Sequence, residues 1–184
     1  MEAFLVSALV VAVGEIGDKT QLLALLLSAR FRRPAPIILG ILVATLANHA
    51  LAGAVGEWVR DSLDPVALRW LVGASFIALA AWALKADKCE GLRDPVDRYG
   101  VFLVTVAAFF VAEMGDKTQI ATIALAAEFH AFIPVVAGTT LGMLVANVPV
   151  VSAADKVVSR IPLKRVRSIA AALFIALGIV VLVA

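Results

Sequence analysis

Residues 15–21 read Glu-Ile-Gly-Asp-Lys-Thr-Gln, and residues 113–119 read Glu-Met-Gly-Asp-Lys-Thr-Gln. The two heptads differ only at their second position. Each lies near the middle of a long apolar segment, where ionised side chains are costly and are usually retained for function. Two carboxylates, a lysine and two neutral polar side chains, placed twice at membrane depth, therefore indicate a binding site.

The composition is that of an integral membrane protein. The 184 residues are 62% hydrophobic and have a mean hydropathy of +1.01, well above the values of soluble domains. The formal net charge of +2 is too small to indicate a nucleic-acid partner. The single cysteine, Cys89, excludes an internal disulfide and forms no zinc site by itself. Glu2 precedes the first apolar run without a basic residue, so we expect a membrane helix there rather than a signal peptide.

Six apolar segments are each suited to cross a hydrocarbon core of about 30 Å as a helix. They are Phe4–Ala29, Pro36–Val59, Leu68–Leu84, Val101–Ala127, Phe132–Ala154 and Ser168–Ala184. The fold class predicted is an all-α integral membrane protein with six transmembrane helices. The first and fourth segments exceed the length of a perpendicular span, so they must tilt, or break near Gly17 and Gly115.

The chain contains an internal repeat with an offset of 98 residues. At this offset the heptads coincide, and so do the pairs Pro36 and Pro134, Gly40 and Gly138, and Arg69 and Arg167. Three helices per repeat is an odd number, so the second repeat enters the membrane from the opposite side. Such inverted repeats place their site at the midplane between the halves. We predict a first repeat in residues 1–87, a central loop in residues 88–100 and an inverted second repeat in residues 101–184.

Lysine and arginine are concentrated in alternate connections. The first, third and fifth connections hold three, four and five of them, whereas the opposite side holds two, Arg60 and Arg69. Because cytoplasmic loops carry the excess of Lys and Arg, we expect both termini outside and the central loop in the cytoplasm. No other targeting segment is visible, so the location expected is a bacterial plasma membrane.

The heptads supply oxygen ligands for a hard divalent cation. The predicted metal-binding carboxylates are Glu15, Asp18, Glu113 and Asp116, and within one helix the two acids of a heptad would share a face. Oxygen ligands suit manganese, calcium or magnesium, and the lack of soft ligands argues against copper and zinc. Further ligand or supporting candidates are Gln21, Gln119, Thr20, Thr118, Asn48 and Asn147.

Lys19 and Lys117 are predicted to balance the charge of the site. Each lies four residues after the glutamate and directly after the aspartate of its own heptad, close enough to neutralise either. Four carboxylates and two ammonium groups leave a charge of −2, which one divalent cation or two protons cancel. Gly17 and Gly115 allow close helix approach or open the backbone. His49, which aligns with Asn147, is interpreted as a packing residue with satisfied hydrogen bonds.

Both heptads resemble the doubled E-x-G-D-[KR]-[TS] signature of the Gdt-type cation/proton exchangers. The resemblance covers essentially the whole chain, with two three-helix repeats, a polar central loop and both signatures. It implies exchange of manganese or calcium against protons. It also implies that the motif acids Glu15, Asp18, Glu113 and Asp116 bind the ion.

We therefore predict a secondary transporter, not an enzyme, that exports Mn²⁺, or alternatively Ca²⁺, in exchange for protons. It needs no cofactor; its partners are the lipid bilayer, the metal ion and protons. The alternatives are a divalent-cation channel, an intramembrane lipid-phosphate hydrolase and a purely structural membrane protein. A hydrolase would need arginines or a nucleophile–base pair beside the acids, and neither heptad contains an arginine or a histidine. The apolar surface suits lipid or a second subunit equally well.

Overall fold

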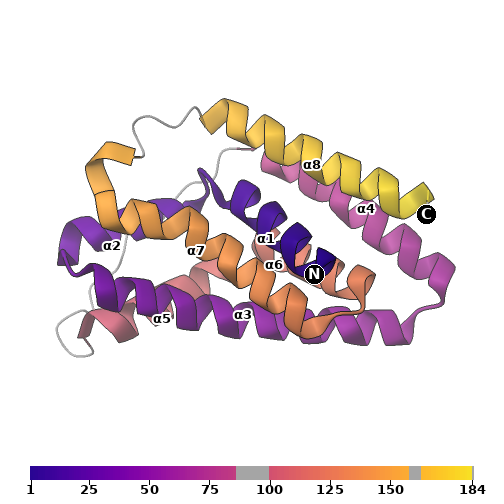
Figure 1. Cartoon of the computed structure of the whole chain (residues 1–184), viewed down its shortest axis with the longest axis horizontal. Helices are drawn as coiled ribbons and strands as arrows, with labels where there is room; N and C mark the ends of the chain where they lie inside the picture. The colour runs from indigo at the N-terminus through magenta and orange to yellow at the C-terminus, as the bar shows by residue number, and fades with distance from the viewer. Residues whose placement is uncertain (86–99, 158–162, 184) are drawn as a thin grey trace.

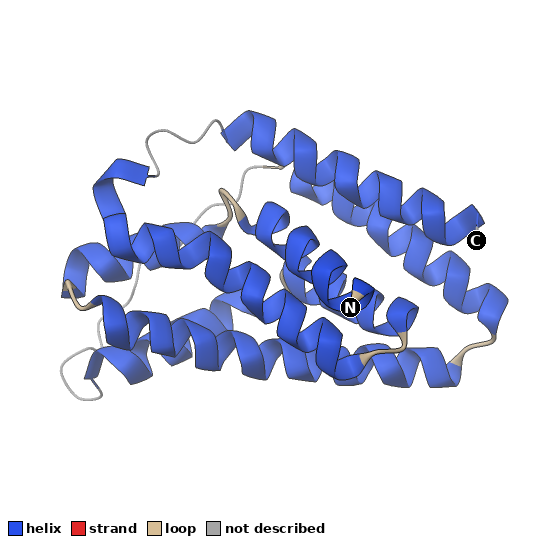
Figure 2. Ribbon diagram, in the orientation of Figure 1, coloured by secondary structure: helices blue, strands red, loops and turns tan. Residues whose placement is uncertain are grey.

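The computed structural model describes residues 1–85, 100–157 and 163–183, and all regular structure in them is α-helical (Figure 2). The helices of the described residues are α1 (Glu2–Glu15), α2 (Lys19–Phe31), α3 (Pro34–Ser62), α4 (Pro65–Ala83), α5 (Gly100–Glu113), α6 (Lys117–Phe129), α7 (Phe132–Val157) and α8 (Leu163–Val183). The predicted central loop of residues 88–100 lies outside the described residues except for Gly100, which begins α5.

Several of these helices are long and apolar enough to cross a membrane. They are α3, α4 and the stretch Phe132–Ser152 of α7, while α5 and the stretch Arg167–Val183 of α8 are shorter apolar helices. A helix occupies each apolar segment that the sequence singled out. The all-helical, apolar architecture agrees with the predicted class of protein.

The first and fourth apolar segments are each broken into two helices. α1 gives way to α2 between Glu15 and Lys19, and α5 gives way to α6 between Glu113 and Lys117. The glycines at the two breaks have positive φ angles, 82° at Gly17 and 72° at Gly115, which side chains other than glycine adopt at a cost. The prediction of a break near these glycines is confirmed. The alternative prediction, that the two acids of a heptad share one helix face, is wrong.

Some helices extend further than the sequence predicted. α3 continues through the polar residues that we assigned to a connection and ends at Ser62. The next helix begins shortly after this end, with Asp64 and Pro65 at its start. The Asp64 side chain accepts hydrogen bonds from the backbone N–H groups of Val66 and Ala67, each at 3.0 Å. An aspartate N-cap followed by proline in the first turn is a strong helix start, so α4 begins there.

The helices of the two halves pack against each other throughout the bundle. α1 lies along α7, α5 and α6 lie along α3, and α4 and α8 run side by side at one edge (Figure 1). The rings of Phe76 in α4 and Phe174 in α8 stack with their centroids 6.3 Å apart. Both rings are buried in the apolar core that also contains Val10, Leu125 and Val135. The core therefore lies between the two halves, which share it rather than each forming a core of its own.

One close helix contact occurs twice with the halves exchanged. A Cβ atom at Gly40 in α3 would lie 2.7 Å from Cβ of Thr105 and 3.0 Å from the carbonyl oxygen of Phe102, both in α5. A Cβ atom at Gly138 in α7 would meet the corresponding positions of α1, the Phe4 carbonyl and the Ser7 side chain. Each pair of positions differs by the repeat offset of 98 residues. Small residues at these crossings allow the helix backbones to approach closely.

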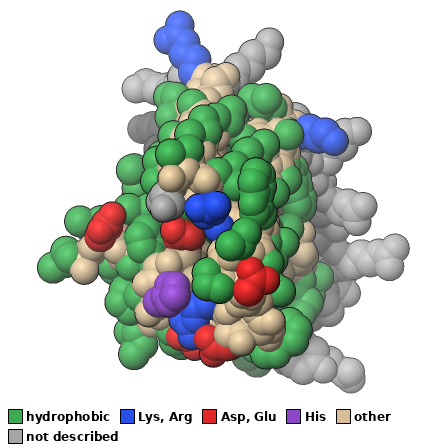
Figure 3. Space-filling model, turned by 90° about the vertical axis from the view of Figure 1, so that its right-hand side faces the viewer, with side chains coloured by type: hydrophobic (Ala, Val, Ile, Leu, Met, Phe, Trp, Pro, Cys, Tyr) green, Lys and Arg blue, Asp and Glu red, His purple; other side chains and the backbone are tan. Residues whose placement is uncertain are grey.

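The outer surface is largely apolar. Figure 3, which views the right-hand end of Figure 1, shows hydrophobic side chains over much of this face, with charged side chains in its middle and lower part and a few others at its edges. Large apolar residues that are more than half exposed include Leu5, Leu39, Leu51, Val111, Ile133 and Val180. An apolar surface of this extent is unusual for a soluble monomer and suits contact with lipid.

Candidate metal centre

Each heptad forms the junction between two helices. α1 ends at Glu15, and Asp18 is the N-cap residue of α2, where its side chain accepts a hydrogen bond of 2.7 Å from the backbone N–H of Lys19. Asp116 holds the same N-cap position before α6 and has almost the same backbone angles. Aspartate is among the preferred N-cap residues because its oxygens accept bonds from the free N–H groups of the first turn. In the first heptad the Asp18 side chain therefore caps the helix that follows the break, whereas the Asp116 side chain makes no such hydrogen bond.

The glutamines fix the shape of both junctions. The side-chain oxygen of Gln21 accepts a hydrogen bond of 2.9 Å from the backbone N–H of Gly17. Gln119 does the same for Gly115 at 2.8 Å. The Nε2 group of Gln21 also donates to the carbonyl oxygen of Ala146 in α7, at 3.1 Å. Through these bonds the two glutamines support the loops, which is one of the two roles considered from the sequence.

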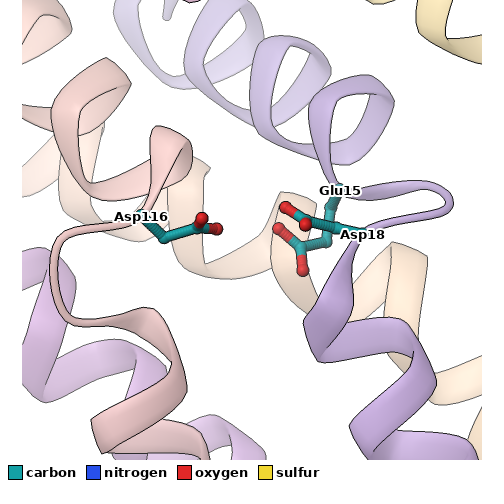
Figure 4. A group of neighbouring side chains, drawn as sticks. All are labelled: Glu15, Asp18 and Asp116. Atoms are coloured by element: carbon teal, nitrogen blue, oxygen red, sulfur yellow. The ribbon is translucent and has the colours of Figure 1, made fainter. Parts of the chain in front are cut away.

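Three of the four predicted carboxylates meet in the interior. Glu15, Asp18 and Asp116 each offer a carboxylate oxygen, and these oxygens all lie within 4.8 Å of one another. Figure 4 shows the three side chains pointing toward one another across the space between the two junctions. All three residues are buried, with exposed fractions of 1% or less. The acids of the first repeat and one acid of the second therefore form one cluster.

Glu113 lies outside that three-acid cluster. It is fully buried, and its Oε2 atom accepts a hydrogen bond of 3.1 Å from the hydroxyl of Thr118. The equivalent hydroxyl in the first repeat, that of Thr20, has no hydrogen-bond partner among the described residues. The two halves of the candidate site are thus similar in sequence but differ in their side-chain contacts.

The two motif lysines cross between the repeats. The ammonium nitrogen of Lys19 lies 3.2 Å from Oδ1 of Asp116, and that of Lys117 lies 2.8 Å from Oδ2 of Asp18. The prediction that each lysine pairs with a carboxylate of its own heptad is therefore wrong, because both of these ion pairs join a lysine to the aspartate of the other repeat. Residue spacing along one helix cannot show this; it follows only when the two junctions face each other.

Several buried oxygen atoms near the junctions are left without a hydrogen bond. Among the described residues no group donates to either carboxylate oxygen of Glu15 or to Oε1 of Glu113, and Asp116 has its ion pair with Lys19 but no hydrogen bond. Buried polar atoms are nearly always hydrogen-bonded in proteins, and a buried charge needs a partner. A divalent cation accepts such oxygens as ligands, so the donor set fits a hard cation of the Mn²⁺, Ca²⁺ or Mg²⁺ type.

The asparagine candidates lie on the helices that cover the junctions. Asn48 in α3 donates from Nδ2 to the carbonyl oxygen of Phe110 in α5, at 3.0 Å. Asn147 in α7 donates to the Met143 carbonyl oxygen of its own helix, at 3.1 Å. Both amide oxygens are buried and have no partner among the described residues. The structure links Asn48 to the helix that ends in the second motif, whereas the bonds of Asn147 stay within α7.

His49 is a residue whose environment the sequence did not indicate. It is fully buried beside Asn48, and neither ring nitrogen has a hydrogen-bond partner in the described part of the chain. The expectation of a satisfied packing residue is wrong in this respect. The sequence feature that could have indicated a role for His49 is its alignment with Asn147, because a polar side chain then lies at the same point in both repeats.

Comparison with known proteins identifies the family. A family model described as a divalent cation/proton antiporter, GDT1, matches residues 3–90 and 101–184. The chain belongs to the GDT1 family. It is 47% identical over 180 residues to a Vibrio cholerae protein named "Putative manganese exporter", covering 97% of this chain and 90% of that protein.

More distant GDT1 relatives also align over nearly the whole chain. The "GDT1-like protein sll0615" of Synechocystis is 31% identical over 199 residues, covering 98% of this chain and 96% of the relative. The "GDT1-like protein 3" of rice is 28% identical over 205 residues, covering 97% of this chain and 72% of the relative. No solved structure gives a significant match.

Membership in the GDT1 family confirms the resemblance seen in the heptads. The chain is a membrane transporter of the cation/proton antiporter class and not an enzyme. A divalent cation and protons are therefore the species that it transports. The channel and the lipid-phosphate hydrolase considered from the sequence are replaced by this assignment.

Proposed function

We propose that this GDT1 protein exports Mn²⁺ from the cytoplasm in exchange for protons and binds the ion between its two motif junctions. The observation that carries the proposal is the cluster of Glu15, Asp18 and Asp116, whose oxygens lie within 4.8 Å of one another. Both oxygens of Glu15 lack a hydrogen-bond partner in the described residues, so this buried carboxylate needs either a cation or a proton. Those are the two species that an antiporter exchanges.

The ligands proposed are the four motif acids, with unequal roles. Glu15, Asp18 and Asp116 would contact the ion directly, and Glu113 would act beside them through the oxygen that Thr118 does not engage. Asn48 is the best placed of the amide candidates because its bond to Phe110 directs it to the helix that ends at Glu113.

Alternating access would follow from six membrane crossings arranged as two inverted repeats, residues 1–87 and 101–184, joined by residues 88–100. The exchanged glycine contacts, Gly40 against α5 and Gly138 against α1, support such a relation. The two ion pairs between the repeats join the halves at the candidate site. One half would rock against the other about this site.

The direction of transport rests on the orientation of the chain. The excess of Lys and Arg in alternate connections favours a cytoplasmic central loop and outer termini in a bacterial plasma membrane. An inward proton gradient would then drive the cation outward. Manganese is preferred over calcium because the relative at 47% identity carries manganese export in its name, although oxygen ligands suit both ions.

The test is exchange by the purified protein in lipid vesicles. An imposed pH gradient is expected to drive saturable Mn²⁺ flux, with Ca²⁺ and Mg²⁺ competing more weakly, and Glu15→Gln is expected to abolish the flux. Direct Mn²⁺ binding to the same samples separates a transporter from a purely structural protein. A Mn²⁺ flux that ignores the pH gradient, or a clear preference for Ca²⁺, would contradict the proposal.

A further inference from the structure

The two ion pairs that cross between the repeats are not equivalent. The contact of Lys117 with Asp18 is 2.8 Å long, and the exposed fractions of the two side chains are 5% and 0%. The contact of Lys19 with Asp116 is 3.2 Å long, and the Lys19 side chain is 28% exposed. The first pair is therefore short and enclosed, whereas the second is longer and reaches the surface at its lysine end.

The two aspartates also depend on their lysines to different degrees. Asp18 accepts a hydrogen bond of 2.7 Å from the backbone N–H of Lys19, which holds its carboxylate as an N-cap. No described residue donates a hydrogen bond to either oxygen of Asp116, so the Lys19 ion pair is the contact that compensates its charge. If Lys19 moved away, both oxygens of Asp116 would be available to another cation.

We propose that Lys19 is a built-in competitor for the transported cation: its ammonium group holds Asp116 until the cation displaces it. The inference rests on the proposed metal site and adds the residue that regulates it. A divalent cation held by Glu15, Asp18 and Asp116 would stand within a few ångströms of the Lys19 ammonium group, and like charges at that distance repel strongly. Lys19 leaves because its partly exposed side chain regains solvation, while the enclosed Lys117 stays on Asp18.

This asymmetry gives the two lysines different tasks. Lys117 joins the repeats both with and without the bound cation, and it keeps Asp18 in place. Lys19 neutralises Asp116 only while the cation is absent, so that the acid cluster does not carry its full negative charge. The role of Lys19 is that of a positioning residue that acts through Asp116.

The first test is Mn²⁺ affinity of the purified full-length protein in lipid nanodiscs, measured by direct binding. Lys19→Gln removes the competing charge and is expected to tighten Mn²⁺ binding by about tenfold or more. Lys19→Arg keeps the charge and offers a forked donor that grips a carboxylate more firmly, so it is expected to weaken Mn²⁺ binding. Lys117→Gln is the matched comparison at the equivalent position. It removes an equal charge but also the ion pair that keeps Asp18 in place, so it is expected to tighten binding less than Lys19→Gln does.

A second test uses the unaltered protein, so it does not depend on how the variants fold. A water-soluble acetylating reagent is applied with and without Mn²⁺, and modification of each lysine is quantified by mass spectrometry. Mn²⁺ is expected to increase acetylation of Lys19 several-fold and to leave Lys117 unchanged.

The outcomes separate this inference from the proposed function. Mn²⁺ binding that weakens in Lys19→Gln, or acetylation of Lys19 that Mn²⁺ lowers or leaves unchanged, would refute the displacement of Lys19 while the metal site stands. Failure of the unaltered protein to bind Mn²⁺ would instead refute the proposed function.

Discussion

Gly138 in α7 lies directly against the backbone carbonyl of Phe4 in α1, and a Cβ atom at this position would overlap that oxygen. The contact belongs to the packing of α1 against α7, which joins the two halves of the protein, and its counterpart joins Gly40 to α5. The neighbouring atoms are backbone, which cannot move aside as the end of a flexible side chain would. Gly40 and Gly138 are therefore among the glycines that allow the repeats to approach closely.

Replacing Gly138 by valine is expected to separate α1 from α7 and to destabilise the protein by about 1–3 kcal/mol, as overpacking of a core does. Thermal unfolding of the purified protein in detergent measures the loss. Gly14→Ala is the control, because a Cβ atom there would meet only the Phe174 ring at 3.6 Å, an ordinary contact. Equal stability of the Gly138 and Gly14 variants would show that the crossing is not tightly packed.

The break between α5 and α6 depends on the positive φ angle of Gly115. No atom lies within 4 Å of a Cβ at this position, so Gly115→Ala tests backbone conformation alone. A left-handed conformation costs other residues about 1–2 kcal/mol, and we expect a loss of stability of this size together with reduced Mn²⁺ transport.

Gly100 provides the matched control, because its φ angle is also 72° and its Cβ space is also empty. Gly100→Ala should cost similar stability at the far end of α5 and should leave transport per folded molecule unchanged. If both variants lower transport equally, the shape of the Gly115 junction has no special role.

The helical segments and the two junctions could be predicted from the sequence, while the contacts at the site could not. The apolar segments and the doubled heptad have strong local signals, and Gly17 and Gly115 indicated where the long segments break. The pairing of Lys19 with Asp116 has no local signal, because its partners are far apart in sequence and meet only where the two junctions face each other. Likewise, the heptads gave no reason for Glu113 to lie outside the cluster that Glu15 joins.

The structure ranks the motif acids more finely than the sequence did. Glu15→Gln and Asp116→Asn each remove a charge from the three-acid cluster. Loss of a residue that only supports a metal ligand weakens metal binding by about 10- to 100-fold, so loss of a ligand itself is expected to weaken Mn²⁺ binding by about 100-fold or more. Glu113→Gln is expected to weaken binding by about tenfold, the lower end of that range, because Glu113 is not one of the three clustered acids and Thr118 engages one of its oxygens. Glu2→Gln, at the exposed start of α1, serves as the control for a lost carboxylate. If Glu113→Gln bound Mn²⁺ more weakly than Glu15→Gln and Asp116→Asn do, the ranking would be wrong.

The proposed orientation can be tested at two equivalent positions. Arg33 precedes α3 and Ala131 precedes α7, and they are separated by the repeat offset. In a Cys89→Ala background, Ala131→Cys is expected to react with a membrane-impermeant maleimide in intact cells. Arg33→Cys is expected to react only after the membrane is permeabilised, because basic connections face the cytoplasm. Labelling of both positions from the same side would exclude an inverted repeat.

The last prediction concerns the charge that crosses the membrane. The four motif acids and two motif lysines carry −2 when all are ionised, and both lysines lie in ion pairs. One divalent cation or two protons would bring this sum to zero, as passage through a low-dielectric interior requires. Lys19 remains in the sum after the cation displaces it from Asp116, because its ammonium group stays on the carrier. Exchange of one Mn²⁺ for two protons would then move no net charge. Flux in vesicles is therefore expected to follow a pH gradient and to respond little to a membrane potential imposed at fixed pH.

Removing one lysine charge provides the decisive comparison. Lys117→Gln leaves the site at −3 when the acids are ionised, so the variant would need a third proton to return in a neutral form. Its flux is expected either to become sensitive to membrane potential or to stop at the return step. Counterflow of labelled Mn²⁺ distinguishes the two, because it needs only the metal-loaded form to cross. Strong potential dependence in the unaltered protein would show that the lysines do not balance the acids, since the carrier would then move charge with both ion pairs intact.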